Sequence, residues 1–164
     1  MPVVQLSDKE IEALLGMSKP LPGDYRSRLR TRARPYSSQH EEAQIEIAVQ
    51  NTGTFRVIIR KNRINPLDFS VILGYVPPER LKLFRLRRHN GAAHEHTNKL
   101  ESNSFHDFHI HYATQRYQEA GWDIDYYAEP TDRYDTVDGA LDTLLDDCSF
   151  IRPESETLQG KLPF

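Results

Sequence analysis

The sequence predicts an α+β fold, in which a twisted antiparallel β-sheet of four to six strands carries helices packed on one face. The first observation is a series of runs with alternating apolar residues between residues 44 and 112. The second is that short turns separate these runs. Such turns cannot hold parallel crossovers, so we expect a meander. The third is that helical patterns lie before and after the sheet region.

The N-terminal region, residues 1–36, is expected to hold a helix and an arginine-rich arm. Ser7 and Glu10 have capping-box spacing, which predicts a helix from about Asp8 to Met17. In the arm, arginine recurs at every second position, so an extended chain would present all the arginines on one side. Such a row suits phosphate contacts, although a solvated arm that discourages edge aggregation has the same pattern. The arginines are Arg26, Arg28, Arg30, Arg32 and Arg34.

Strand-like runs follow the arm. The first two, QIEIAVQ and TFRVIIRK, flank an NTG turn and predict a hairpin. The next three are LDFSVILGYV, LKLFRLRRHNG and FHDFHIHY, which predict the third, fourth and fifth strands. Between the last two lies a polar loop, GAAHEHTNKLESNS, and loops that join rigid strands often carry functional groups.

The region from residue 112 to residue 150 is expected to be helical at both ends. YATQRYQEAG predicts a short helix that ends at Gly121, and Thr136 is the expected N-cap of a longer one. The segment between them has the composition of a loop. We therefore expect one domain over residues 1–150 and a flexible tail over residues 151–164.

The bulk properties of the chain favour a cytoplasmic protein. Its 164 residues suit one domain, and no apolar run is long enough to cross a membrane. The start of the chain lacks the pattern of a signal peptide. The single cysteine, Cys148, excludes an internal disulfide framework and a cysteine-rich zinc module, and we expect its side chain to be buried.

The net charge of −3 hides a segregation of charge along the chain. Residues 25–66 contain nine Lys and Arg against three Glu, whereas residues 118–156 contain twelve Asp and Glu against two Arg. The basic part suggests an anionic partner, above all a nucleic acid. The acidic part suits either a solvated face or contact with a basic protein, and assembly into a homo-oligomer is left open.

Six of the seven histidines lie between His89 and His111. Because side chains alternate along a strand, Asp107, His109 and His111 should share one face of the fifth strand. His106 should point the other way, with the core residues, and serve the structure.

The fourth strand should add cations to the polar face of the fifth. Alternation places Arg85, Arg87 and His89 together, and pairing of the two strands would bring them beside His109 and His111. A single bulge would reverse part of this order. A face of this composition is too polar to be a core.

Three functions compete for this cluster with a purely structural polar face. The first is a metal site for Zn, Ni or Fe, with Glu101 as a further ligand; the region is loosely similar to the first cupin motif, but no second cupin motif follows. The second is metal-independent cleavage of RNA, in which two histidines move protons and an arginine stabilises the charged phosphate. The third is a module that binds nucleic acid or protein without chemistry. The possible metal ligands are His94, His96, His109 and His111.

Two runs form a signature: R-x-N-G-x-x-H-x-H-x-N over 88–98 and F-H-I-H-x-A-T-x-R-Y over 108–117. Together they resemble an uncharacterised family of small bacterial proteins that is similar to toxins of toxin–antitoxin modules. The resemblance spans roughly residues 45–150. It implies a small α+β domain, a nucleic-acid-cleaving activity and an antitoxin partner. The matched positions are Arg60, Arg88, Asn90, His94, Asn98, His109, His111, Thr114, Arg116 and Tyr117.

The leading hypothesis is a toxin-like cytoplasmic ribonuclease that acts on RNA without a metal cofactor. Strand alternation would turn Arg88 away from Arg85 and Arg87, so either the strand bends there or Arg88 serves the fold. The expected catalytic residues are His109, His111, His94, His96 and Arg88. The residues expected to contact nucleic acid are Arg26, Arg28, Arg30, Arg32, Arg34, Arg60, Arg85, Arg87, Arg116 and Tyr117.

Overall fold

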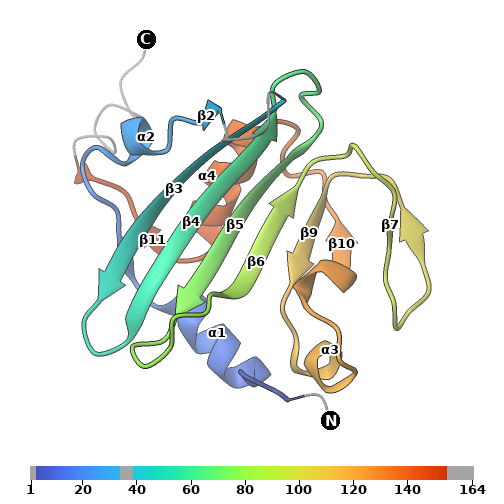
Figure 1. Cartoon of the computed structure of the whole chain (residues 1–164), viewed down its shortest axis with the longest axis horizontal. Coiled ribbons are helices and arrows are strands. Elements are labelled where there is room, and N and C mark those ends of the chain that lie inside the picture. Colours follow the sequence, from blue (N-terminus) through green and yellow to red (C-terminus); the bar gives the residue numbers. More distant parts are fainter. Residues whose placement is uncertain (1–2, 34–38, 155–164) are drawn as a thin grey trace.

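A seven-stranded antiparallel sheet forms the centre of the molecule (Figure 1). The computed structural model describes residues 3–33 and 39–154. The strand order β10-β9-β6-β5-β4-β3-β2 contains the expected meander, and the predicted α+β class is confirmed. The sheet exceeds the expected range by one strand, because short strands extend both of its edges. The strands are β2 (Arg32–Ala33), β3 (His40–Val49), β4 (Gly53–Asn62), β5 (Phe69–Val76), β6 (Phe84–Asn90), β9 (His109–Tyr112) and β10 (Ala128–Pro130).

One face of the sheet is covered by helices and forms the core. Figure 1 shows α4 (Val137–Asp147) crossing behind the strands, and α1 (Asp8–Gly16) adds buried side chains to the same cluster. In β4, Phe55, Val57 and Ile59 point into this core, and the alternate residues point away. Burial of one such side chain stabilises the fold by about 1.5–3 kcal/mol.

The opposite face carries both polar and apolar side chains, which lie in rows across the sheet because paired residues of neighbouring strands point to the same side. These rows lead to the histidines of β9. One row consists of Glu42, Arg60, Ser70, Asn90 and His109. The neighbouring row consists of Gln44, Ile58, Ile72, Arg88 and His111.

Capping residues start three of the helices. Ser7 and Glu10 form the complete capping box of α1, as expected. Thr136 caps α4 through its side chain, and Thr114 does the same for α3 (Gln115–Glu119). Each cap satisfies a backbone N–H that has no partner within the helix, so these helix starts follow from local sequence.

The arginine-rich arm departs from the extended form expected for it. Its first part is a short helix, α2 (Tyr25–Arg28), and only β2 is extended. The side chains of Tyr25 and Leu29 lie in the core. These two residues are four positions apart, so a helical turn puts both side chains on the buried side. Their burial favours a helix over the extended form that the alternating arginines suggest. The expected single row of arginines is therefore wrong for the helical part, and Arg34 lies outside the described residues.

A small parallel pair joins the C-terminal region to the N-terminal region. β1 (Lys19–Pro20) pairs with β11 (Phe150–Ile151), so the domain boundary expected at residue 150 falls inside this pair. Of the expected tail, residues 155–164 lie outside the described part of the chain. The ammonium group of Lys19 is fully buried and donates, over 2.7–3.1 Å, to the carbonyl oxygens of Leu14, Leu15, Met17 and Cys148. The side chain of Cys148 is fully buried, as expected.

Two small elements lie at the β9–β10 edge of the sheet. A hairpin of β7 (His96–Thr97) and β8 (Ser104–Phe105) occupies the segment expected to be a loop (Figure 1). The 3-10 helix η1 (Ile124–Tyr126) precedes β10. Within residues 3–33 and 39–154, no helix has the length and apolar character needed to span a membrane.

Candidate metal centre

A bulge in β6 decides which of its side chains face the histidines of β9. The register with β5 shifts within β6, so the simple alternation of side chains is broken there. Arg88 pairs with His111 and Asn90 pairs with His109. Because paired residues point to the same face, Arg88 and Asn90 belong to the site.

The shared face expected for Arg85, Arg87 and His89 is wrong for two of the three. Arg87 and His89 pair with Tyr112 and Ile110, and Ile110 belongs to the core. Arg87 and His89 therefore lie on the helix-covered face. Arg85 precedes the bulge and stays on the open face, as expected. Because of the bulge, Arg88 takes the place on the open face that alternation predicts for Arg87.

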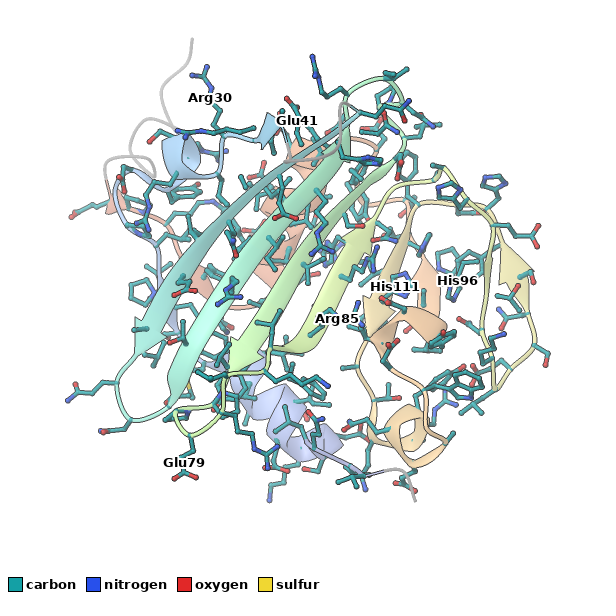
Figure 2. All side chains as sticks on the ribbon, in the orientation of Figure 1. Arg30, Glu41, Glu79, Arg85, His96 and His111 are labelled. Carbon is teal, nitrogen blue, oxygen red and sulfur yellow. The ribbon has the colours of Figure 1, made fainter. Side chains whose placement is uncertain are left out.

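Three histidines converge beside the sheet edge. The ring centroids of His96, His109 and His111 lie 4.9–5.4 Å apart, and one nitrogen of each ring lies within 4.8 Å of the other two. Figure 2 shows His96 of the hairpin beside His111 of β9. His94 lines the same space but is exposed and lies outside this group.

Two of the rings are fixed by backbone carbonyl groups. Nδ1 of His109 donates to the carbonyl oxygen of Asp107 at 2.8 Å. Nδ1 of His111 lies 3.1 Å from the carbonyl oxygens of Ile124 and Tyr127. A carbonyl oxygen can only accept a hydrogen bond, so Nδ1 carries the proton in each neutral ring. Nε2 then keeps its lone pair for another partner.

The third ring, His96, is fixed by the side chain of Asn98. Nε2 of His96 donates to Oδ1 of Asn98 at 2.7 Å, which leaves the lone pair on Nδ1. The amide of Asn98 is buried and oriented by β10, because its Oδ1 accepts from the N–H of Ala128 and its Nδ2 donates to the carbonyl oxygen of Ala128. Nδ2 also donates to Oδ1 of Asn103. One amide therefore connects the hairpin, the sheet edge and a histidine.

Burial keeps two of these imidazoles neutral. Burial, with smaller contributions from the neighbouring His109 and Arg88, lowers the pKa of His111 to about 3. Burial also lowers the pKa of His109 below its usual value. Near neutral pH both rings are therefore neutral and keep an unprotonated Nε2, which is the form that a metal ion requires.

A network of polar side chains adjoins the histidines. The guanidinium of Arg88 donates to Oδ1 of Asp125 and to Oδ1 of Asn90, both at 2.8 Å. It also donates to Oγ of Ser70 at 2.9 Å. Nδ2 of Asn90 lies 3.4 Å from Nε2 of His111, so the network reaches a ring nitrogen of the cluster.

Sequence reasoning missed Ser70 and Asp125. Ser70 could have been found, because it is the one polar residue inside the apolar run FSVILGYV. Asp125 gave no such signal, since it lies in a segment rich in acidic residues. Its role depends on distant partners: Nη1 of Arg85 binds both of its carboxylate oxygens at 2.8 Å.

The histidines and the polar network line one cavity of about 320 Å³. Its wall also contains Asp68, Glu95 and Phe69. Gly91 lies at this wall, and a side chain there would overlap the carbonyl oxygen of Leu67. The glycine that follows Asn90 is therefore required by the close approach of two backbone segments.

Several residues expected at the site have other roles. Glu101, considered as a metal ligand, instead accepts a hydrogen bond from Tyr117 and pairs with Arg116, both at 2.6 Å. These three residues do not line the histidine cavity. Arg60 lies on the open sheet face, where it pairs with Glu42 at 2.8 Å.

The described arginines of the N-terminal arm do not line the cavity either. Arg26 pairs with Asp142 at 3.4 Å, and Arg28 lies 3.9 Å from Asp24. His106, expected to have a structural role, is exposed and lies outside the histidine group. The site is thus built mainly from β6, β9, the β7–β8 hairpin and η1.

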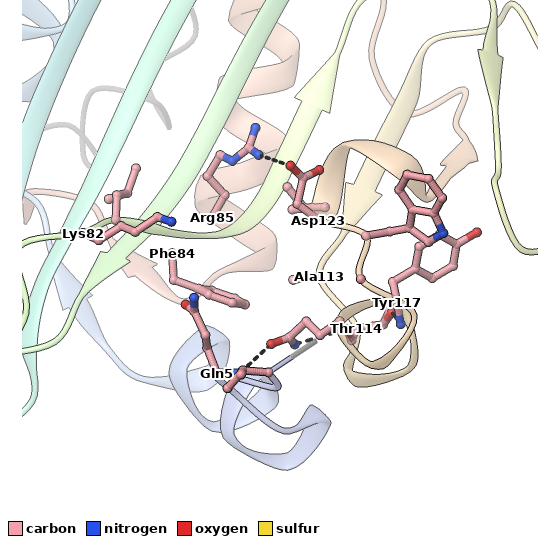
Figure 3. A pocket seen from close by; sticks show the side chains of 14 residues that line it. Gln5, Lys82, Phe84, Arg85, Ala113, Thr114, Tyr117 and Asp123 are labelled. Atoms are coloured by element: carbon pink, nitrogen blue, oxygen red, sulfur yellow. Dashed lines mark hydrogen bonds and ion pairs between the residues drawn. The ribbon is translucent and has the colours of Figure 1, made fainter. Parts of the chain in front are cut away.

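A second cavity, of about 380 Å³, is lined in part by Arg85 (Figure 3), whose guanidinium binds Asp125 of the first cavity. Phe84, Thr114 and Tyr117 line it, and Arg85 reaches Asp123 there at 3.2 Å. None of the described residues around this cavity is a histidine. The groups suited to metal binding therefore gather in the first cavity.

The spacing of the histidines fits a divalent metal ion after a small adjustment. In a tetrahedral site with Zn–N bonds of about 2.0–2.1 Å, ligand nitrogens lie about 3.3 Å apart. Nitrogens within 4.8 Å of one another would each move by about 1 Å or less. All three rings already have the second hydrogen bond that usually orients a histidine ligand.

Comparison with known proteins finds no matching family model, no similar curated protein and no similar solved structure. The fold and the histidine cluster therefore carry the functional argument. The resemblance to toxin-like proteins stays a prediction.

Proposed function

We propose that the protein binds a divalent metal ion, with Zn²⁺ as the first choice, through His96, His109 and His111. One observation carries this proposal: each ring has one nitrogen held by a hydrogen bond, while the cluster brings one nitrogen of each ring within 4.8 Å of the others. Neutral imidazole suits Zn, Ni and Fe. Three protein ligands are also typical of catalytic zinc sites, which keep a further position for water or substrate.

Metal-assisted hydrolysis is the activity that best suits such a centre. The ion would supply a Lewis acid and lower the pKa of a bound water. The residues of this chain would supply the surrounding wall, in which Arg88 and Asn90 hold fixed orientations. Preorganised polar groups of this kind stabilise charge that develops during a reaction.

The test is zinc affinity, measured by competition with a chromophoric chelator. His96→Gln, His109→Gln and His111→Gln should each lose more than the roughly 10–100-fold that follows the loss of an outer-shell partner. His106→Gln is the matched control, because this histidine is exposed and outside the cluster. Wild-type protein that binds no Zn²⁺, Ni²⁺ or Fe²⁺ would contradict the proposal, as would equal losses in the control.

A second candidate is RNA cleavage without a metal. It is favoured by the pairing of Arg88 with His111, which puts a cation beside a pair of imidazoles. The pKa of His111, about 3, counts against it, because such a ring is a weak base near neutral pH. Total RNA is incubated in EDTA with wild-type protein and with the His109→Ala/His111→Ala double variant. Cleavage that survives EDTA and disappears in the variant supports this candidate, and no cleavage by either protein removes it.

The other expectations from the sequence stay predictions. They are an RNA substrate, an antitoxin partner and a cytoplasmic location. The ion pairs of Arg26, Arg28 and Arg60 reduce the free positive charge available for a nucleic-acid strand. A direct test of RNA binding is the salt dependence of affinity, which falls steeply with salt when several phosphates are contacted.

A further inference from the structure

We propose that the cavity binds a small oxyanion, a phosphate or carboxylate group, which is held jointly by the metal ion and by the guanidinium of Arg88. This inference rests on the proposed metal centre and names the class of substrate that it would accept. Arg88 lines the cavity next to the histidine cluster, since it pairs with His111 across two neighbouring strands.

The positive charge of Arg88 is incompletely balanced. Its carboxylate partner is Asp125, but the same carboxylate also binds Arg85 through both oxygens. Two guanidinium groups therefore share one partly buried carboxylate. A further carboxylate, Asp123, pairs with Arg85 at 3.2 Å, yet its side chain is 56% exposed and is well screened by water.

The electrostatics of Arg88 agree with this imbalance. Burial lowers its pKa below the usual value, and although Asp125 opposes this effect, Arg85 and Arg60 add to it. A charge that is taken out of water without full compensation favours a further counter-ion. An anion that enters the cavity would supply one.

Arg88 also has donors to spare. A guanidinium has five N–H groups in a planar fork. Hydrogen bonds from Nε, Nη1 and Nη2 to Asn90, Asp125 and Ser70 occupy three of them. The other two have no acceptor among the described residues, while the neutral partners Asn90 and Ser70 fix the plane of the group. Such a fork suits the oxygens of a phosphate or a carboxylate.

The size and surroundings of the cavity favour a small anion over a nucleic-acid strand. The cavity volume of about 320 Å³ lies near the lower end of ordinary ligand sites. On the open sheet face beside it, Arg56 pairs with Glu46 at 2.6 Å and Arg60 pairs with Glu42 at 2.8 Å. These two pairs neutralise arginines on the described part of this face, which makes it less suited to a polyanion.

The experiment uses Co²⁺-loaded full-length protein, because the visible spectrum of Co²⁺ reports a change in its ligands. The probes are inorganic phosphate, methyl phosphate, acetate and a short oligonucleotide, each added until the spectrum stops changing. Phosphate or acetate should alter the spectrum at saturation, and the more effective of the two identifies the source of the oxyanion. Arg88→Gln should weaken this binding by about tenfold or more, as expected for the loss of a charge-assisted pair.

Arg56→Gln is the matched control, since it removes an arginine from the same sheet face outside the cavity and should leave anion affinity unchanged. If Arg88→Gln does not fold, Arg88→Lys is used, which keeps the charge but loses the fork and should also bind more weakly. Equal affinity in wild type and in the folded Arg88 variant overturns the inference. So does a spectrum that responds to no small anion, or only to the oligonucleotide.

The same samples separate this inference from the proposed function. Failure of the protein to take up Co²⁺ overturns the metal centre and the shared oxyanion site together. Uptake of Co²⁺ without any response to phosphate or acetate leaves the metal centre standing and overturns the oxyanion inference alone.

Discussion

Replacement of Asn98 by alanine should weaken both the fold and the metal site. The side chain is 3% exposed and makes four hydrogen bonds, two to Ala128 and one each to His96 and Asn103. A hydrogen bond contributes about 1 kcal/mol, and a buried group that loses its partner costs about 1–3 kcal/mol. Because Ala128 is buried, Asn98→Ala should lower the free energy of unfolding by about 3 kcal/mol.

The effect on the metal has a separate origin. Without Oδ1 of Asn98, the ring of His96 loses the partner that selects its tautomer and orientation. Loss of an outer-shell partner of this kind typically lowers metal affinity by about 10–100-fold. Unfolding is measured with urea, and zinc affinity by chelator competition on the folded protein.

Two further variants separate the two effects. Asn98→Asp keeps the oxygen that accepts from His96 but loses the donors to Ala128 and Asn103, so stability should fall while zinc affinity stays close to wild type. Asn103→Ala removes only an exposed partner and should cost less than about 1 kcal/mol. Wild-type zinc affinity in Asn98→Ala would refute the orienting role. Wild-type stability in the same variant would refute the hydrogen-bond argument.

Three other outcomes are expected. Lys19→Met should lower the free energy of unfolding by about 3 kcal/mol or more in urea melts, because two buried and two partly buried carbonyl oxygens lose their donor. Burial lowers the pKa of His89 from 6.5 to about 3, so the unfolded chain binds a proton first and stability falls as pH drops through this range. His89 alone should account for a loss of about 2 kcal/mol between pH 7 and pH 5. His89→Phe should remove this share and leave the share of His111, as measured in urea melts at the two pH values. Stripping bound metal with EDTA should lower the melting temperature of wild type but not of His109→Gln/His111→Gln, and equal shifts would count against the metal site.

The strands and capped helices could be predicted because their signals are local. Alternating apolar residues identify β3, β4 and β5, and the capping residues Ser7, Thr114 and Thr136 start three helices. The arginine arm could not be predicted in this way. Its regular spacing suggests a strand, but the burial of Tyr25 and Leu29 against distant parts of the chain favours a helical turn.

The candidate site was predictable only in part, because some of its side chains are placed by local alternation and others by contacts with distant parts of the chain. Alternation correctly placed His109 and His111 on one face, because β9 is regular. The exchange of Arg87 for Arg88 follows from a bulge, and a bulge depends on how two strands pair. The choice of His96 as the third histidine also depends on tertiary structure, since the hairpin and β10 position it.

The metal content of the full-length protein tests the central claim most directly. Bound metal is first removed from the purified protein with a chelator. The protein is then dialysed against excess Zn²⁺ and afterwards against metal-free buffer, and its metal content is measured by inductively coupled plasma mass spectrometry. We expect one zinc ion per chain in wild type and none in the His109→Gln/His111→Gln variant, with equal folded fractions in both samples. Wild-type protein that retains no metal, or a folded double variant that retains as much as wild type, would contradict the account.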